Sequence, residues 1–158
     1  MIILVEGPDG AGKTELINKL LRSHPDSSTL HFGAPKTQEE EENYWMVYMR
    51  AISETDPNKL TLFDRCWYSD LVYAPVMRGK PGMDMRHVKM LEKYVIASGG
   101  GHVVHCTANI HVLWARCQRR GEDYVTEKSQ LEAIAKSYED VLTNKCTLPV
   151  IRYDTSHL

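Results

Sequence analysis

The residues with the clearest chemical potential lie near the N-terminus. Residues 7–14 read GPDGAGKT, which fits the pattern G-x-x-x-x-G-K-[ST]. An apolar run at 2–5 precedes this segment, and an amphipathic stretch follows it. Glycines let backbone N–H groups approach phosphate oxygens, and the N-terminus of a following helix adds positive potential at the same place. The sequence therefore predicts a loop that binds the phosphates of a nucleoside triphosphate.

Each part of this loop has an expected role. Lys13 is expected to reach the β- and γ-phosphates of ATP, and the hydroxyl of Thr14 is expected to bind Mg²⁺. A glycine-rich turn with a chance GKT is the alternative, and the flanking strand and helix patterns disfavour it. The other expected ATP contacts in the loop are Gly7, Asp9, Gly10, Ala11 and Gly12.

A second pair of candidate residues follows the apolar segment 60–63. Asp64 ends this segment, and it is the best candidate for the further acidic group that a P-loop metal site needs. Arg65 adjoins it and can hold a second anion through bidentate hydrogen bonds. The alternatives are a solvent-facing helix cap for Asp64 and a surface salt bridge for Arg65. Their shared place at the end of one strand favours a role in a cleft.

Composition limits the class of protein. The chain has 158 residues, of which 42% are hydrophobic and 25% charged, and this suits a single domain over residues 1–158. The net charge of −2 gives no basic surface for nucleic acid, so small-molecule nucleotides are the expected partners. Four cysteines without a C-x-x-C pair favour reduced thiols and a cytoplasmic protein. There is no apolar run of about 18 residues, so no contact with a membrane is expected.

Strand and helix patterns alternate along the chain. Strands are expected at about 2–6, 29–32, 60–63, 102–107 and 148–153. Helices are expected after the P-loop to about residue 22, at 37–54, after residue 66, after residue 84, at 109–119 and at 129–143. This alternation predicts an α/β fold with a five-stranded parallel sheet and helices on both faces. Ligands of such sheets bind beyond the carboxyl ends of the strands.

Two segments together resemble the thymidylate kinase family. Residues 6–14 read EGPDGAGKT and residues 64–69 read DRCWYS, and a looser resemblance runs through most of the chain. The resemblance implies a nucleoside monophosphate kinase type of P-loop domain with a short lid at about 116–126. ATP would give its γ-phosphoryl group to a deoxynucleoside 5′-monophosphate, with dTMP as the expected acceptor and Mg²⁺ as the cofactor. By analogy of fold, a homodimer built through helices is also expected.

The resemblance assigns roles around the acceptor. Asp9 would lie near the sugar, Arg65 would hold the acceptor phosphate near the γ-phosphate, and Arg50 would contact the base. Tyr73 matches an aromatic residue that packs against the deoxyribose and disfavours a 2′-hydroxyl. The remaining candidates for contacts with the acceptor are Lys36 and Ser69.

A catalytic arginine is expected in the lid. Members of the family carry it either in the P-loop or in the lid, and the variable P-loop positions 8–11 hold no arginine. Arg119 and Arg120 are the favoured candidates, and Arg116 is expected to contact ATP. A basic helix C-terminus that complements the helix dipole is the alternative for each of the three.

Two residues depart from the family pattern, and two alternative functions stay open. Ala74 replaces a glutamine and Met46 replaces a base-stacking phenylalanine, so the identity of the base is not fixed. A deoxynucleoside kinase would need a carboxylate base near a neutral 5′-hydroxyl, and Glu6 is one such carboxylate. A nucleotide-binding regulatory module is the other alternative.

Overall fold

The computed structural model describes residues 1–121 and 123–158. The strands are β1 (Ile2–Glu6), β2 (Ser28–His31), β3 (Thr61–Asp64), β4 (Gly101–Thr107) and β5 (Val150–Asp154). The helices are α1 (Lys13–Ser23), α2 (Gln38–Ser53), α3 (Trp67–Arg78), α4 (Met85–Ala97), α5 (Ile110–Arg120) and α6 (Lys128–Asn144). No helix in these two ranges is long and apolar enough to cross a membrane.

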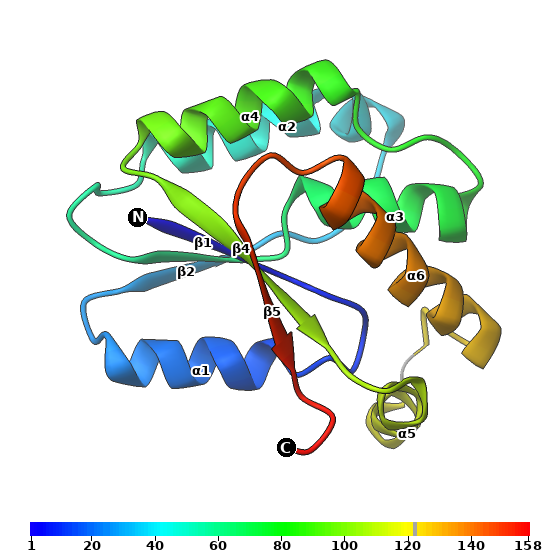
Figure 1. The fold of residues 1–158 in the computed structure, drawn as a ribbon. Coiled ribbons are helices and arrows are strands. Elements are labelled where there is room, and N and C mark those ends of the chain that lie inside the picture. The colour runs from blue at the N-terminus through cyan, green and yellow to red at the C-terminus, as the bar shows by residue number, and fades with distance from the viewer. Residues whose placement is uncertain (122) are drawn as a thin grey trace.

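The five strands form one parallel sheet in the order β2-β3-β1-β4-β5. Figure 1 shows α1 on one side of this sheet, with α2 and α4 running together on the other. Every residue of the central strand β1 is buried, as expected for a strand covered on both faces. The predicted fold class, a five-stranded parallel sheet with helices on both faces, is confirmed.

The register of the sheet brings candidate site residues to one edge. Val5 of β1 pairs with Asp64 of β3, and Asp64 pairs in turn with His31 of β2. On the other side of β1, Glu6 pairs with His105 of β4. Because parallel strands end at the same edge, the P-loop after β1 lies beside the ends of β2 and β3.

Local sequence signals set most of the element ends. The side chain of Thr37 accepts a hydrogen bond from the backbone N–H of Glu40 at 3.1 Å, which caps α2. Gly79, in the left-handed conformation with φ 64°, ends α3. The last strand begins at Val150, two residues later than expected, and the buried Leu148 lies in the connection before it.

The segment predicted as a lid, about 116–126, has two parts. Residues 116–120 form the C-terminal part of α5, which ends at Arg120. A short connection leads from there to α6. Within that connection Glu122 lies outside the described residues. The arginines predicted for the lid are therefore carried by a regular helix beside the P-loop.

Candidate active site

The P-loop between β1 and α1 depends on glycine at three positions. Gly7, Gly10 and Gly12 have φ angles of 147°, 80° and 83°, which side chains rarely adopt. A Cβ atom at Gly7 would also lie 2.3 Å from the carbonyl oxygen of Cys106 in β4. The loop can therefore lie close against β4 only because Gly7 has no side chain.

Lys13 is held inside this loop. Its Nζ donates hydrogen bonds to the carbonyl oxygens of Gly7 at 2.8 Å and Pro8 at 2.9 Å, and the residue is only 9% exposed. Burial, and after it the charge of Arg65, lowers the pKa of Lys13 to about 8. The ammonium group thus rests on loop carbonyls at the place where the sequence predicts contact with phosphate.

A cavity in front of the loop, here called the P-loop cavity, brings together most of the residues expected around the donor phosphates. Its lining includes Thr14, Asp64 and Arg120 as well as the loop backbone from Asp9 to Lys13. The carboxylate of Asp64 also pairs with Nδ1 of His31 at 2.9 Å, a contact the sequence did not predict.

The oxygen atoms of this cavity suit Mg²⁺. A hydroxyl from Thr14 and a carboxylate from Asp64 are hard oxygen ligands, and Mg²⁺ commonly takes only one or two protein ligands and completes its shell with phosphates and water. Among residues 1–121 and 123–158 no group of three His, Cys, Asp or Glu side chains could hold a metal without such help. The donor set therefore fits a metal that arrives with a phosphorylated substrate.

Arg65 lies where the P-loop cavity meets a second cavity. Its Nη2 donates to Oδ1 of Asp9 at 2.8 Å, and its Nη1 lies 3.3 Å from both Ser69 Oγ and the hydroxyl of Tyr138. The guanidinium is 5.2 Å from the centre of the Tyr73 ring. Arg65 itself has a φ of 69°, a left-handed backbone conformation that is uncommon outside glycine.

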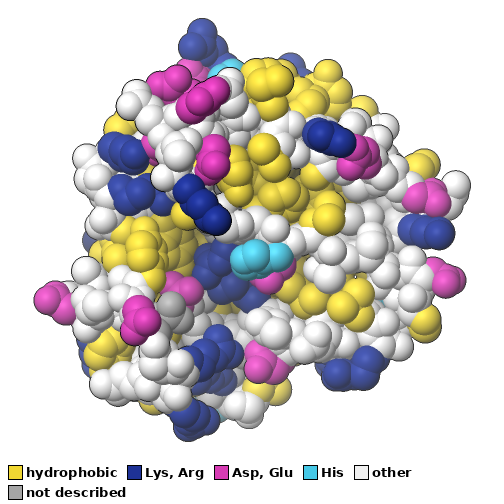
Figure 2. Space-filling model, turned by 180° about the vertical axis from the view of Figure 1, so that it is seen from behind, with side chains coloured by type: hydrophobic (Ala, Val, Ile, Leu, Met, Phe, Trp, Pro, Cys, Tyr) yellow, Lys and Arg dark blue, Asp and Glu magenta, His cyan; other side chains and the backbone are white. Residues whose placement is uncertain are grey.

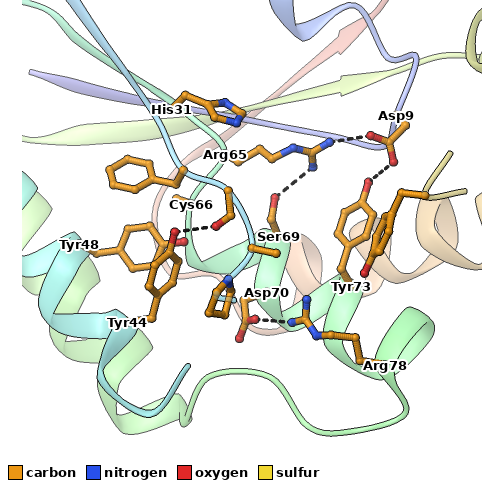
Figure 3. Close-up of a pocket in the computed structure, with 15 residues that line it drawn as sticks. Asp9, His31, Tyr44, Tyr48, Arg65, Cys66, Ser69, Asp70, Tyr73 and Arg78 are labelled. Carbon is orange, nitrogen blue, oxygen red and sulfur yellow. Dashed lines mark hydrogen bonds and ion pairs between the residues drawn. The ribbon is translucent and has the colours of Figure 1, made fainter. Parts of the chain in front are cut away.

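The second cavity, here called the aromatic pocket, is built from segments far apart in the sequence. Phe32, Tyr44 and Tyr48 line one side, and Tyr73 and Tyr124 line another. Figure 3 shows Tyr44 and Tyr48 on α2, across the pocket from Tyr73 on α3. Three residues line both this pocket and the P-loop cavity: Asp9, His31 and Arg65.

Buried hydrogen bonds to Glu6 fix the start of α3. One carboxylate oxygen accepts from the backbone N–H groups of Cys66 at 2.7 Å and Ser69 at 3.2 Å. The other accepts from Ser69 Oγ at 2.7 Å and from the hydroxyl of Tyr138 at 3.0 Å. Because both oxygens of Glu6 are used in this way and the residue is fully buried, its carboxylate serves as an anchor of α3.

The predicted acceptor residues divide into two groups. Asp9, Arg65, Ser69 and Tyr73 all line the aromatic pocket, and the hydroxyl of Tyr73 donates to Oδ2 of Asp9 at 2.7 Å. Lys36 instead lines a neighbouring hollow between the start of α2 and the loop before α4.

Arg50 lies away from both cavities, contrary to the expected contact with a base. Its side chain is 81% exposed and pairs with Glu54 at 2.9 Å on the outside of α2. Helical geometry explains this, because Tyr48 is buried and a residue two positions further along lies about 200° around the helix. Met46 is exposed for the same reason.

The three arginines of α5 have different places. Arg116 donates to the carbonyl oxygen of Gly10 at 3.0 Å and to that of Thr155 at 2.7 Å, so it ties the P-loop to the C-terminal segment. Arg120 lines the P-loop cavity, whereas Arg119 does not. All three also line a groove between α1, α5 and the C-terminal segment, here called the basic groove.

The basic groove collects positive charge. Its basic residues are Lys19, Arg22, Arg116, Arg119 and Arg120. Glu15 lines it too and lies 3.8 Å from Arg120. On the face of the molecule shown in Figure 2, Lys and Arg side chains are spread over the surface with Asp and Glu side chains among them, and several lie near the middle and the lower edge.

Sequence reasoning missed several residues of the aromatic pocket. The one available signal was the i, i+4 spacing of Tyr44 and Tyr48, which places two aromatic rings on one face of α2. Asp70 and Arg78, eight residues apart on α3, carried no such signal, although they form an ion pair at 2.7 Å in the pocket wall.

Solved structures show the same fold. The YorR protein of Bacillus subtilis, in complex with phosphorylated GDP, is 23% identical, with a TM-score of 0.80 over 98% of this chain and 86% of that chain. The deoxyadenosine kinase of M. mycoides with bound dATP is 15% identical, with a TM-score of 0.66 over 98% of this chain and 91% of that one. With the products dCMP and dCDP bound, that kinase gives 16% identity and a TM-score of 0.62 over 98% and 90% of the two chains.

Sequence comparisons identify the family. Comparison with curated proteins found no match. The family model for polyphosphate kinase 2 matches residues 1–107, a region that holds the P-loop, Asp64, Arg65 and most of the lining of the aromatic pocket. This is a kinase family, so a phosphotransferase with a P-loop is established, while the choice of dTMP as acceptor stays a prediction. Because the match covers more than half of its length, the chain belongs to the polyphosphate kinase 2 (PPK2) family.

Proposed function

We propose that this protein transfers a terminal phosphoryl group to a deoxynucleoside 5′-monophosphate held in the aromatic pocket. The observation that carries the proposal is the junction of the two cavities at Asp9, His31 and Arg65. A donor phosphate in the P-loop cavity and an acceptor phosphate beside Arg65 would meet there. Phosphoryl transfer needs this kind of close, aligned contact between two anions.

The side chains at the junction suit an acceptor that is itself a phosphate. Arg65 supplies fixed positive charge, and Lys13 and Arg120 supply more on the donor side. A phosphate oxygen is already ionised at neutral pH, so its attack needs no general base. Catalysis then rests on position and on neutralising the charge of the transferring group. Mg²⁺ held through Thr14 and Asp64 would neutralise further charge on the donor.

The hydrogen bonds of the nearby carboxylates favour a nucleoside monophosphate kinase over a deoxynucleoside kinase. A neutral 5′-hydroxyl acceptor needs a carboxylate that is free to take its proton. Both oxygens of Glu6 accept internal hydrogen bonds, and those of Asp9 are bonded to Arg65 and Tyr73. This arrangement favours a monophosphate over a nucleoside.

The donor has two candidates. ATP is the donor that the P-loop motif predicts. Inorganic polyphosphate is the second, since the family name points to it and the basic groove offers several positive charges to a polyanion. Replacing ATP with polyphosphate in the same assay decides between them. If the groove holds polyphosphate, Arg119→Ala lowers turnover with polyphosphate more than turnover with ATP.

The test of the proposal compares acceptors and an arginine variant. The full chain is assayed with Mg²⁺, either donor, the four deoxynucleoside monophosphates and the matching nucleosides. We expect turnover only with the monophosphates, and we expect Arg65→Ala to lower kcat/KM on the order of 10³-fold. Arg86→Ala is the matched control, because that arginine is exposed and pairs with Asp84 away from both cavities. Preferred use of nucleosides, or near-normal activity of Arg65→Ala, contradicts the proposal.

A further inference from the structure

Opposite the phosphate junction, the aromatic pocket contains a pair of opposite charges. Figure 3 shows Asp70 and Arg78 at one end of the pocket and Arg65 and Asp9 at the other. Neither Asp70 nor Arg78 lines the P-loop cavity. An acceptor whose phosphate contacts Arg65 would therefore direct its other end, the base, between the aromatic side chains and toward this pair.

The pair is held rigidly. Arg78 Nη2 donates to Oδ1 of Asp70 at 2.7 Å, and the backbone N–H of Met83 donates to Oδ2 at 2.7 Å. The loop that carries Met83 lies directly on α3, because a Cβ atom at Gly82 would be 2.8 Å from the carbonyl oxygen of Asp70. The side chains of Asp70 and Arg78 are only 11% and 22% exposed.

The pair keeps unused hydrogen-bonding capacity inside the pocket. Asp70 makes one hydrogen bond per carboxylate oxygen, and each such oxygen can accept a second. Arg78 uses one of its five N–H donors within the described part of the chain, and its buried Nε has no partner there. A buried ion pair contributes little to stability by itself, so stability alone does not account for this arrangement.

A nucleobase has the complementary pattern on its hydrogen-bonding edge. On its Watson–Crick edge each base presents a donor next to an acceptor, and the order and number of these groups differ between bases. Arg78 can donate to a base acceptor while Asp70 accepts from the neighbouring base donor. The aromatic side chains of Phe32, Tyr44 and Tyr48 offer apolar contact to the ring itself.

We propose that Asp70 and Arg78 bind the hydrogen-bonding edge of the acceptor's base and so determine which base the protein selects. This inference rests on the proposed function, in which the aromatic pocket holds a nucleotide. It replaces Arg50, which lies outside the pocket, with two residues that line it. A hydrogen bond to a charged group typically discriminates by about tenfold or more when the partner is lost.

The test measures binding, so that it does not depend on turnover. The full chain is titrated by calorimetry with each of the four deoxynucleoside monophosphates and with deoxyribose 5-phosphate. Asp70→Asn keeps the shape of the side chain and removes its charge. We expect the ratio of Kd between the weakest and the tightest base to fall at least tenfold, while the Kd of deoxyribose 5-phosphate changes less than threefold. Arg78→Met should give the same pattern, and it replaces Asp70→Asn if that variant is not folded.

Asp84→Asn is the matched control, because Asp84 lies in the neighbouring hollow, is partly exposed and is absent from the lining of the aromatic pocket. It should leave all five Kd values unchanged. Equal weakening of every ligand by Asp70→Asn, deoxyribose 5-phosphate included, overturns the inference, as does a wild-type protein that binds all four bases equally. Selective binding without phosphorylation of any nucleotide contradicts the proposed function and leaves the base-selecting role standing.

Discussion

Arg65 combines a strained backbone with a central place in the site. Its φ of 69° is of the kind that costs on the order of 1–3 kcal/mol for a residue with a side chain. The backbone N–H of Arg65 donates to the carbonyl oxygen of Val5 at 3.1 Å, and its guanidinium is fixed by Asp9. The surrounding contacts therefore hold Arg65 in a conformation that points its charge between the two cavities.

Lys13 makes donor binding depend on pH. Its ammonium is charged below a pKa of about 8 and loses its proton as the pH rises through that value. Since only the charged form attracts phosphate strongly, we expect kcat/KM for the donor to be flat between pH 7 and 7.5. Above a pH of about 8 it should fall by up to tenfold per pH unit. Steady-state rates at low donor concentration between pH 7 and 9.5 measure this.

The pH dependence of kcat provides an internal comparison for the pH dependence of kcat/KM. Bound phosphates favour the charged form of Lys13, so kcat at saturating donor should stay flat to a higher pH than kcat/KM. Circular dichroism at each pH confirms that the fold persists. A kcat/KM profile that is flat to pH 9.5 contradicts the role given to the lowered pKa.

At the residue scale, the sequence predicts the donor side better than the acceptor side. Lys13, Thr14, Asp64 and Arg65 follow directly from a local motif or from the end of one strand, and the structure brings all four to the P-loop cavity. The acceptor side is assembled from separate elements. The pairing of Asp70 with Arg78 depends on the loop after α3, which no local pattern describes.

At the element scale, Glu6 connects β1 to α3 and α6. It accepts hydrogen bonds from Cys66, which precedes α3, from Ser69 in its first turn, and from Tyr138 of α6. Helices α3 and α6 also pack along each other. A carboxylate near a helix N-terminus is also favoured by the helix dipole. This contact sets the position of Ser69 and of the α3 face that lines the aromatic pocket.

Glu6→Ala is expected to destabilise the protein by roughly 3 kcal/mol, because it leaves buried N–H and hydroxyl groups without acceptors. For a chain of this size that corresponds to a fall in Tm of roughly 6–12 °C. Thermal unfolding followed by circular dichroism measures the change. Glu139→Ala is the control, since Glu139 forms an exposed ion pair with Arg152 and should shift Tm by no more than about 3 °C. Equal shifts for the two variants would show that Glu6 does not anchor α3.

Helix α2 shows why an element can be predicted while its orientation is not. Its bounds follow from the cap at Thr37 and from the turn after Ser53. Which face turns inward depends on packing against α4 and on the contacts of Tyr48 with Phe32 and Trp67. That packing buries Tyr48 and exposes Arg50, so the residue predicted to contact the base lies outside the aromatic pocket for a reason found only in the tertiary structure.

At the scale of the whole molecule, the fold was predictable because several local signals agree. Apolar strands alternate with amphipathic helices from β1 to β5, and the P-loop follows β1, which is the central strand of the sheet. The edge of the sheet where ligands bind follows from that topology. The base specificity does not follow from it, because the aromatic pocket depends on helix orientation and on the loop between α3 and α4.

The central claim is that the two cavities hold a donor and an acceptor in line. The most direct measurement incubates the full chain and Mg²⁺ with ATP labelled in its γ-phosphate, then repeats this with labelled polyphosphate, each with a mixture of the four deoxynucleoside monophosphates. Chromatography then identifies every labelled product. We predict label in a deoxynucleoside diphosphate, lost in Arg65→Ala and retained in Arg86→Ala. Label only in inorganic phosphate, with no labelled nucleotide from either donor, would contradict the account.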